Sequence, residues 1–531
     1  MYNLKWIVGG RVKLEKTYGR ITLLANITEK ELLSLGQKKQ DEAIIEILEN
    51  SKPLHDKNRQ DSEYLKSFYY GDQDIKNKVK QTRPEINNKT VENWAYACVD
   101  FKKTFLLGKP IQYVQFNSSD SAEISTLNKF VRYENKKAKD MDLFEDVLVC
   151  GRGFRYINKD KLGSEDEAPF EIINCPVEDT EVVYSSRLGN EQLFAFIDTP
   201  MYDYQPSMGD NGVEVLKPVL YDVYQVYLRN KVVTYSSKGG SLQRIGKPQP
   251  LIWNEHIIIE SYLNRKRISL IELGKDLFND INYLESLDKD DMEQFVNAIM
   301  VFTNAEVSKE DLSDIKEMGA VCISSTEQKK ASVDLLQGRL NAQDTQTYYN
   351  RLLTSLHQIL AIPIASDSGT VTSGDTGKAK LTGQGFTSAG IRAEGDECMF
   401  GMCDLKALKV ILAICRNTPN SGITTLKVSE VEPKFQRDMS DNILVKTQAL
   451  QNLYSCDIPR EIANSIVNLF GDSAKVSQEQ QKLFGDQVSQ QNKGSNSSDF
   501  GTNGETTNAE DMANFQNNQI TNKSELDNQG Q

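Results

Sequence analysis

The stretch EINNKTVENWAYACVDFKKTFLLGKPIQY, residues 85–113, combines a helix with the start of a strand. Asn88 is the expected N-cap of the helix, and Gly108 and Pro110 end it. The following PIQYVQF predicts a short strand. Apolar side chains recur at helical spacing and predict a face packed on a core: Val91, Trp94, Ala95, Cys98, Val99 and Phe105.

Further secondary-structure signals lie on both sides of this stretch. Upstream, ITEKELLSLGQKKQDEAIIEILENS predicts a helix in which Thr28 is the N-cap and Glu31 completes a capping box. Downstream, VLVCGRGF (147–154) is typical of a helix end that passes into a strand. From 142 to 260, short β-branched and aromatic runs alternate with Gly, Asp and Asn turns, which predicts antiparallel strands. The expected fold class is therefore α+β.

Two amphipathic helices are expected after the β-rich region. From Glu272 to Glu293 the first helix carries eight acidic residues against Lys275 and Lys289, a net charge of −6 that predicts a solvated acidic surface. About 45 residues that predict a small αβ insertion separate it from the second helix, which ends at Pro363. The apolar face of the first helix consists of Leu270, Leu273, Leu277, Ile281 and Leu284. That of the second consists of Tyr349, Leu352, Leu353, Leu356 and Leu360.

The chain's overall composition excludes several classes of protein. No apolar run approaches the roughly 20 residues that a membrane helix needs, and the N-terminus lacks the pattern of a secretory signal. Eight cysteines without a CxxC pair indicate reduced thiols in a cytoplasmic protein. The net charge of −13 argues against tight binding of nucleic acid, because such proteins neutralise phosphates with Lys and Arg.

The glycine-containing stretch IPIASDSGTVTSGDTGKAK, residues 362–380, raises the possibility of a nucleotide-binding P-loop. A P-loop needs G-x-x-x-x-G-K-[ST] between a strand and a helix. Here Ala379 follows Lys378, Thr372 stands where the first glycine belongs, and a helix precedes the loop. The three histidines lie far apart without neighbours at ligand spacing. The sequence therefore predicts no catalytic residue, no metal site and no cofactor.

The order of these parts resembles the portal proteins of tailed bacteriophages. YYGDQDI (69–75) and the stretch 85–113 are similar to the opening signature of that family: Tyr-x-Gly, an Asn-containing segment leading into a helix, then an apolar-Gly-x-Pro-Ile strand entry. EDVLVCGRGFRYI (145–157), DTEVVYS (179–185) and the later helices follow in the family's order. The resemblance covers about residues 60 to 470 and rests on the collinearity of several weak motifs.

The resemblance implies a division of the chain into the parts of a portal subunit. An N-terminal extension (1–55) precedes a wing (56–265) of strands and helices. Two stem helices (266–297 and 343–363) flank an αβ clip (298–342). A tunnel loop (364–378) leads into a long glycine-containing wing helix (379–418), which the interior glycines should bend or interrupt. A helical crown (419–486) and a disordered tail (487–531) end the chain.

The resemblance also implies a function, partners and functional residues. Twelve chains would form a ring at one capsid vertex, through which double-stranded DNA is packaged and ejected without sequence-specific contact. Expected partners are the major capsid and scaffolding proteins, the terminase motor and the head–tail adaptors, in the host cytoplasm during assembly and then in the virion. The clip residues expected to bind partners are Glu310, Asp311, Asp314 and Glu317.

Two further sets of residues are assigned by the same resemblance. The tunnel loop facing DNA would consist of Ser366, Asp367, Ser368, Gly369, Thr370, Val371, Thr372, Ser373, Gly374, Asp375, Thr376, Gly377, Lys378 and Lys380. The stem channel and subunit interface would involve Leu270, Leu273, Leu277, Ile281, Leu284, Asp276, Asp280, Leu352 and Leu356. Two alternatives stay open: a head-completion adaptor or scaffold-type protein without a channel, and a nucleotide-binding enzyme of the packaging machinery.

Overall fold

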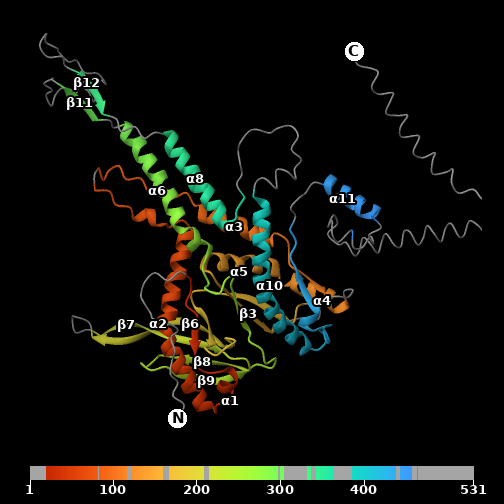
Figure 1. Cartoon of the computed structure of the whole chain (residues 1–531). Helices are drawn as coiled ribbons and strands as arrows, with labels where there is room; N and C mark the ends of the chain where they lie inside the picture. Colours follow the sequence, from red (N-terminus) through yellow and green to blue (C-terminus); the bar gives the residue numbers. More distant parts are fainter. Residues whose placement is uncertain are drawn as a thin grey trace, which may run out of the picture. The chain divides into compact units, whose positions relative to one another are not determined.

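The computed structural model describes residues 19–81, 83–116, 121–159, 167–208, 214–296, 299–303, 332–336, 342–363, 385–437, 443–456 and 463. The chain divides into two units, Met1–Arg437 and Asp438–Gln531. Of the described elements, the second unit holds helix α11 (Ile443–Ser455), and all others belong to the first unit. The mixture of helices and mainly antiparallel strands agrees with the predicted α+β class (Figure 1).

The N-terminal segment consists of strand β1 (Leu23–Ala25), helix α1 (Glu29–Ser34) and the long helix α2 (Gln37–Tyr69). The predicted capping box is confirmed, because Glu31 N donates to Thr28 Oγ1 at 3.2 Å and Thr28 N donates to Glu31 Oε2 at 2.9 Å. The single helix predicted here is two helices, since the backbone is extended at Gly36. Helix α2 also runs through the expected boundary at residue 55.

A six-stranded sheet packs against these helices, with the order β1-β5-β6-β7-β8-β9. Its later strands are β5 (Thr180–Ser185), β6 (Gln192–Met208), β7 (Glu214–Tyr227), β8 (Lys231–Ser236) and β9 (Gln243–Pro250). β1 pairs with β5 in parallel, and the remaining pairs are antiparallel as predicted. Ile44 and Ile47 of α2 share a buried cluster with Phe194 and Phe196 of β6, so α2 covers one face of the sheet.

A second layer contains the stretch 85–113. Its helices are α3 (Trp94–Leu107), α4 (Ala122–Tyr133), α5 (Lys136–Cys150) and α10 (Phe386–Arg416). Its strands are β2 (Gln112–Gln115), which pairs with β13 (Val431–Lys434), and the sheet β10-β3-β4 of Ile258–Ser261, Gly153–Lys159 and Phe170–Cys175. The predicted helix-to-strand step is confirmed: α5 ends at Gly151, whose φ of 82° suits glycine, and β3 follows.

Two predictions about helices in this layer are wrong: the N-cap of helix α3 and an interruption of helix α10 at its glycines. Helix α3 starts at Trp94, and its N-cap is Asn93, whose Oδ1 accepts from Tyr96 N at 3.2 Å, so Asn88 is not the cap. Helix α10 runs without interruption through its glycines. Its second half is deeply buried, and an added Cβ at Gly401 would lie 3.4 Å from Phe435. Burial and close packing thus offset a glycine cost of about 1 kcal/mol per residue.

Two antiparallel helices extend from the rest of the first unit and carry a β-hairpin at their far end (Figure 1). They are helix α6 (Leu270–Val296) and helix α8 (Ala342–Leu360), and the hairpin consists of β11 (Ile299–Thr303) and β12 (Ser332–Leu336). Short 3-10 turns, η1 (Asp74–Asn77) and η2 (Val428–Glu430), complete the first unit. This arrangement matches the predicted order of helix, insertion and helix.

Candidate functional site

The α6–α8 pair holds the described part of the predicted functional surface. Leu352, Leu356 and Leu360 of α8 are buried as predicted, at 6%, 0% and 3% exposure. The two helices approach closely at Gly274, where an added Cβ would lie 3.3 Å from Leu356 Cδ1. Glycine at this position therefore permits α6 to pack tightly against α8.

The apolar face of α6 is rotated relative to the predicted stripe. Ile271 and Phe278, which were not predicted, are buried together with Leu270 and Ile281. Leu273 is 57% exposed, whereas Leu277 and Leu284 pack against the core from its margin. The stripe is therefore not one surface: Leu270 and Ile281 belong to the chain's own core, while Leu273 faces outward.

The outward side of Leu273 lines a groove of about 390 Å³ at the base of the helical pair. Leu263 and Ile268 also line this groove, so its floor is apolar. Its charged residues are mostly basic: Lys102, Arg265, Lys266 and Arg392, with the acid Asp396. Leu273 thus remains available for contact outside the described chain, which is what an interface residue requires.

The acids of α6 divide into two groups that the sequence did not distinguish. Asp276 and Asp280 are exposed as predicted. Glu272 instead pairs with Arg20 and accepts from Ser269 N at 2.8 Å, while Glu272 N donates to Ser269 Oγ, so it caps the helix. Asp290 is 1% exposed, which contradicts its prediction as part of a solvated face.

Polar residues of the 73–92 segment bind α6, and this segment includes the start of the stretch 85–113. Thr90 N donates to Ser286 Oγ at 3.0 Å, and Glu92 N donates to Asn282 Oδ1 at 2.8 Å. Nearer the start of α6, Asn279 Nδ2 donates to Asp74 at 3.0 Å. The family-like motif therefore fixes the position of α6 through side chains that lie about 200 residues away in sequence.

Asp290 is the most strongly bound member of this segment's contacts. Lys78 Nζ and Lys80 Nζ lie 3.0 and 3.2 Å from Asp290 Oδ2, and Asn88 donates to Oδ1 through its backbone N–H and its side chain. Burial opposes ionisation of this carboxyl, but these hydrogen bonds and cations lower the pKa of Asp290 to about 2. Asn88, which was predicted to cap a helix, binds the carboxylate of Asp290 instead.

Replacing Asp290 with Asn should lower the free energy of unfolding at neutral pH by about 2 kcal/mol, because a depressed folded pKa stabilises the ionised protein. The contribution is complete above the unfolded pKa of about 4 and disappears as the pH falls towards 2. Denaturant unfolding of wild type and Asp290→Asn at several pH values measures it. The exposed Asp280→Asn is the control, and a difference that persists unchanged at pH 2.5 would contradict the assignment.

Two buried charge clusters are not apparent from the sequence. In the first, His55 of α2 is fully buried, with Nδ1 3.5 Å from Glu181 and Nε2 3.7 Å from Asp198. Arg152 pairs with Glu181. Burial would raise the pKa of Glu181, but the Arg152 guanidinium outweighs burial and holds this pKa below its usual value. The cluster joins α2 to the sheet. No sequence signal indicates it, because its members belong to separate elements.

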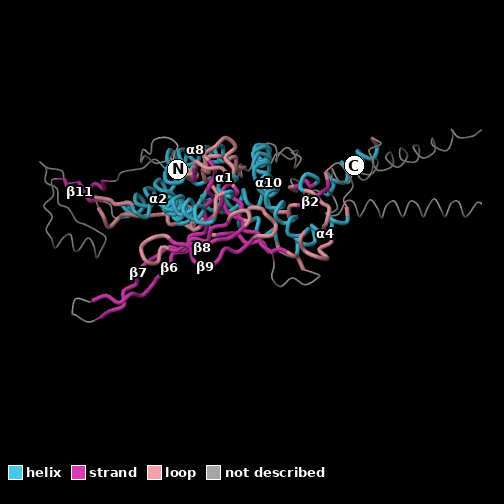
Figure 2. The backbone as a smooth tube through the Cα atoms, turned by 90° about the horizontal axis from the view of Figure 1, so that it is seen from below, coloured by secondary structure: helices cyan, strands magenta, loops and turns pink. Residues whose placement is uncertain are grey.

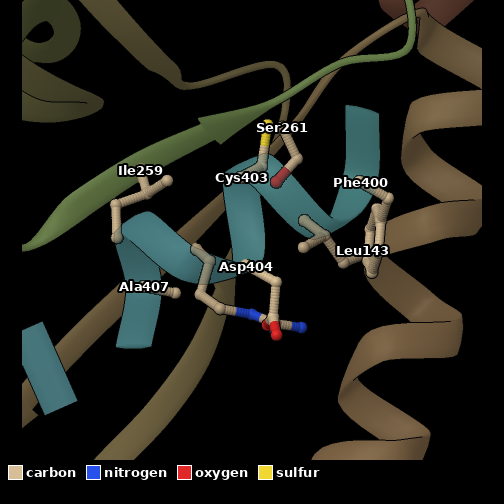
Figure 3. Close-up of a pocket in the computed structure, with 8 residues that line it drawn as sticks. Leu143, Ile259, Ser261, Phe400, Cys403, Asp404 and Ala407 are labelled. Carbon is tan, nitrogen blue, oxygen red and sulfur yellow. The ribbon is translucent and has the colours of Figure 1, made fainter. Parts of the chain in front are cut away.

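The second cluster joins α10 to α5, β2 and β3. Asp404 of α10 accepts from Tyr113 Oη at 2.7 Å and lies 2.8 Å from Lys136 Nζ. Asp140 binds both Lys136 and Arg155 at 2.6 Å. Figure 3 shows the adjacent crevice, with Asp404 below Cys403 on α10 and Phe400 beside Leu143. The space between these side chains does not admit a water molecule, so it is packed core and not a ligand site.

Other predicted functional residues lie outside the described part of the chain. These are the tunnel-loop residues 366–380 and the clip residues Glu310, Asp311, Asp314 and Glu317. The residues on either side of the loop are described: an added Cβ at Gly385 would lie 3.6 Å from Pro363 Cα. The chain therefore leaves and re-enters the described structure at nearly the same point.

Neither a cluster of metal-ligating side chains nor a membrane-spanning helix is found among the described residues. Among them, no group of three or more His, Cys, Asp or Glu side chains is arranged to hold a metal ion. Their helices include none with an apolar stretch long enough to span a bilayer. The seven described cysteines are all unpaired, and only Cys398 and Cys456 among them are exposed.

Comparison with known proteins identifies the family. The family model described as "Phage portal protein, SPP1 Gp6-like" matches residues 48–493. The curated portal protein of Bacillus phage SPP1 is 23% identical over 310 residues, which is 56% of this chain and 56% of that protein. The match thus spans about half the length of this relative. Because the family model covers most of the chain, this chain belongs to the phage portal protein family of the SPP1 Gp6-like type.

Proposed function

We propose that the chain forms a closed ring, of twelve copies in the expected case, at one capsid vertex, and that double-stranded DNA passes through it during packaging and ejection. The observation that carries this proposal is the family match across residues 48–493. The family is structural and not enzymatic, so the chain is expected to turn over no nucleotide. The ring would bind the terminase motor first and the head–tail adaptors later, beside capsid and scaffolding proteins.

The electrostatics of the helical pair support a conduit. Asp276 and Asp280 are exposed on α6, and the pKa of the nearby Glu285 is raised, first by partial burial and then by repulsion from Glu92 and Asp288. Repeated around a ring, such carboxylates would repel the duplex from the wall. A conduit benefits from this because each neutralised phosphate adds affinity and would slow sliding.

The ring itself is tested with purified protein by native mass measurement and negative-stain microscopy. Rings with a central hole, at a mass of many 59.9 kDa chains, and no ATPase activity are the expected result. A monomer at every protein and salt concentration, in the presence of scaffolding protein as well, would refute the proposal.

Reversing two channel charges should create salt-dependent DNA binding. The Asp276→Lys/Asp280→Lys ring is expected to bind duplex DNA at least tenfold more tightly than wild type at low salt, with log affinity falling steeply as salt rises. Fluorescence anisotropy of a labelled duplex at several salt concentrations measures this. The matched control is Glu42→Lys/Glu49→Lys, which makes the same charge change at exposed positions of α2. Equal DNA binding by both variants would show that α6 does not face the DNA.

A further inference from the structure

The β6–β7 ribbon continues well beyond the sheet to which it belongs. β5 pairs with β6 only as far as Ile197, and β8 pairs with β7 only from Val223. The pairing of β6 with β7 continues to Met208 and Glu214. The outer ribbon, Thr199–Met208 with Glu214–Asp222, therefore has no flanking strand among the described residues and extends by roughly 30 Å, at about 3.3 Å per residue. Figure 2 shows it projecting from the body.

One face of the outer ribbon is apolar and exposed. The strand register pairs Tyr202 with Leu220, Tyr204 with Pro218, and Pro206 with Leu216, and side chains two positions apart share a face. Tyr202 and Tyr204 are each 66% exposed, Leu216 is 62% exposed and Leu220 is 55% exposed. We call this surface the arm face: Tyr202, Tyr204, Pro206, Leu216, Pro218 and Leu220. An isolated two-stranded ribbon is marginally stable, so this face needs a partner.

Nearer the body, the same face of the ribbon is already covered by a helix. Phe196 of β6 packs edge-on against His55 of α2, with ring centroids 5.3 Å apart. Lys52 of α2 lies 2.7 Å from Asp222, the last residue before the exposed arm face. The arm face thus continues a surface on which α2 packs, and it begins where α2 no longer reaches.

The edges of the ribbon are poor sites for another strand. Pro200 and Pro206 of β6 and Pro218 of β7 have no backbone N–H to donate, and Asp222 of β7 is already bonded to Ser237 through both N and O. Prolines on exposed edges block edge-to-edge pairing. Contact through the arm face is therefore favoured over addition of a strand.

We propose that the arm face packs on a second copy of this chain, so that each subunit reaches its neighbour through the β6–β7 ribbon. This proposal rests on the proposed ring, whose head-to-tail contacts join two different surfaces of the same chain. The two tyrosines, each two-thirds exposed, offer roughly 200–330 Å². With the leucines and prolines, the arm face approaches half of the roughly 800 Å² that each partner buries in a standard interface.

The opposite face of the ribbon mixes polar and apolar side chains and supplies the control. Its polar members include Asp203, which pairs with Lys238 at 3.0 Å, and Lys217 opposite Gln205. Met201 and Val219 on this face are 46% and 41% exposed. Met201→Asp/Val219→Asp therefore adds the same two charges to the same ribbon without altering the arm face.

The test compares ring assembly of purified wild type, Tyr202→Asp/Tyr204→Asp and this control by native mass over a dilution series. The measured quantity is the protein concentration at which half of the chains are in rings. We expect the arm-face variant to raise this concentration at least tenfold and the control to raise it less than twofold. Both tyrosines are exposed, so the variant should fold. In a second measurement, a photo-crosslinking benzoylphenylalanine at position 204 should yield a covalent dimer of the 59.9 kDa chain.

The possible outcomes distinguish failure of the arm-face contact from failure of ring formation. If wild type forms rings but the arm-face variant assembles like the control, the proposed contact of the arm face is wrong. The same holds if wild type forms rings and no covalent dimer is found. In both cases the proposed function stands. Absence of wild-type rings at every protein and salt concentration, with scaffolding protein present as well, would refute the proposed function instead. If covalent dimers were then also absent, the arm face would have another occupant and this proposal would be wrong.

Discussion

Deletion of residues 368–376 is expected to abolish DNA packaging while rings still assemble. The segment is the predicted tunnel loop, whose Ser, Thr and Gly residues would touch phosphates weakly as DNA passes. A ring that lacks it would keep its shape but lose its contact with the moving duplex. The expected effect is a fall in packaged DNA to background level.

The described residues at the base of the loop explain why the ring should survive. Gly385 and Pro363 lie in near contact, and each is held by its own helix. Ile362 N donates to His357 O at 2.9 Å at the end of α8, and Ala389 N donates to Gly385 O at 3.0 Å at the start of α10. The residues that remain, 364–367 and 377–384, easily bridge so short a gap.

The measurement is the amount of nuclease-protected DNA in an in vitro packaging reaction, beside negative-stain images of the rings. The control replaces 368–376 by a Gly/Ser segment of equal length, which separates the need for a loop from the need for its particular residues. Normal packaging by the deletion variant would reject the tunnel-loop assignment.

Replacing Asp404 with Ala should destabilise the first unit by about 3–5 kcal/mol, because it removes one partner of a buried ion cluster. Asp404 is 4% exposed, and its carboxylate accepts a hydrogen bond from Tyr113. Burial and the charge of Asp404 raise the pKa of the Tyr113 hydroxyl well above its usual value, so Tyr113 stays neutral. Without it, Lys136 and Arg155 would share only Asp140.

Chemical denaturation monitored by circular dichroism measures the loss. Glu394→Ala is the matched control, since Glu394 is an exposed acid of the same helix and its replacement should change stability by no more than about 0.5 kcal/mol. Equal stability of both variants would mean that the cluster contributes nothing beyond packing.

Local features were predictable from the sequence alone. The capping box at Thr28, the helix-to-strand step at Gly151 and the apolar face of α8 all depend on residues within a few positions of one another. Helix capping and amphipathic periodicity act over that range, so the pattern of residue types was sufficient. The family resemblance likewise needed only the order of such local motifs.

Features that depend on distant partners were not predictable. The sequence predicts Asn88 to be a helix cap, but Asn88 binds Asp290. In the sequence Asp404 is one more polar residue of a helix, but its partner Tyr113 lies 291 residues away. The rotation of α6 that exposes Leu273 depends on its packing against α8 and the 73–92 segment. Sequence determined the elements and the family; tertiary structure decided which faces and charges are buried, because burial depends on what the rest of the chain places beside them.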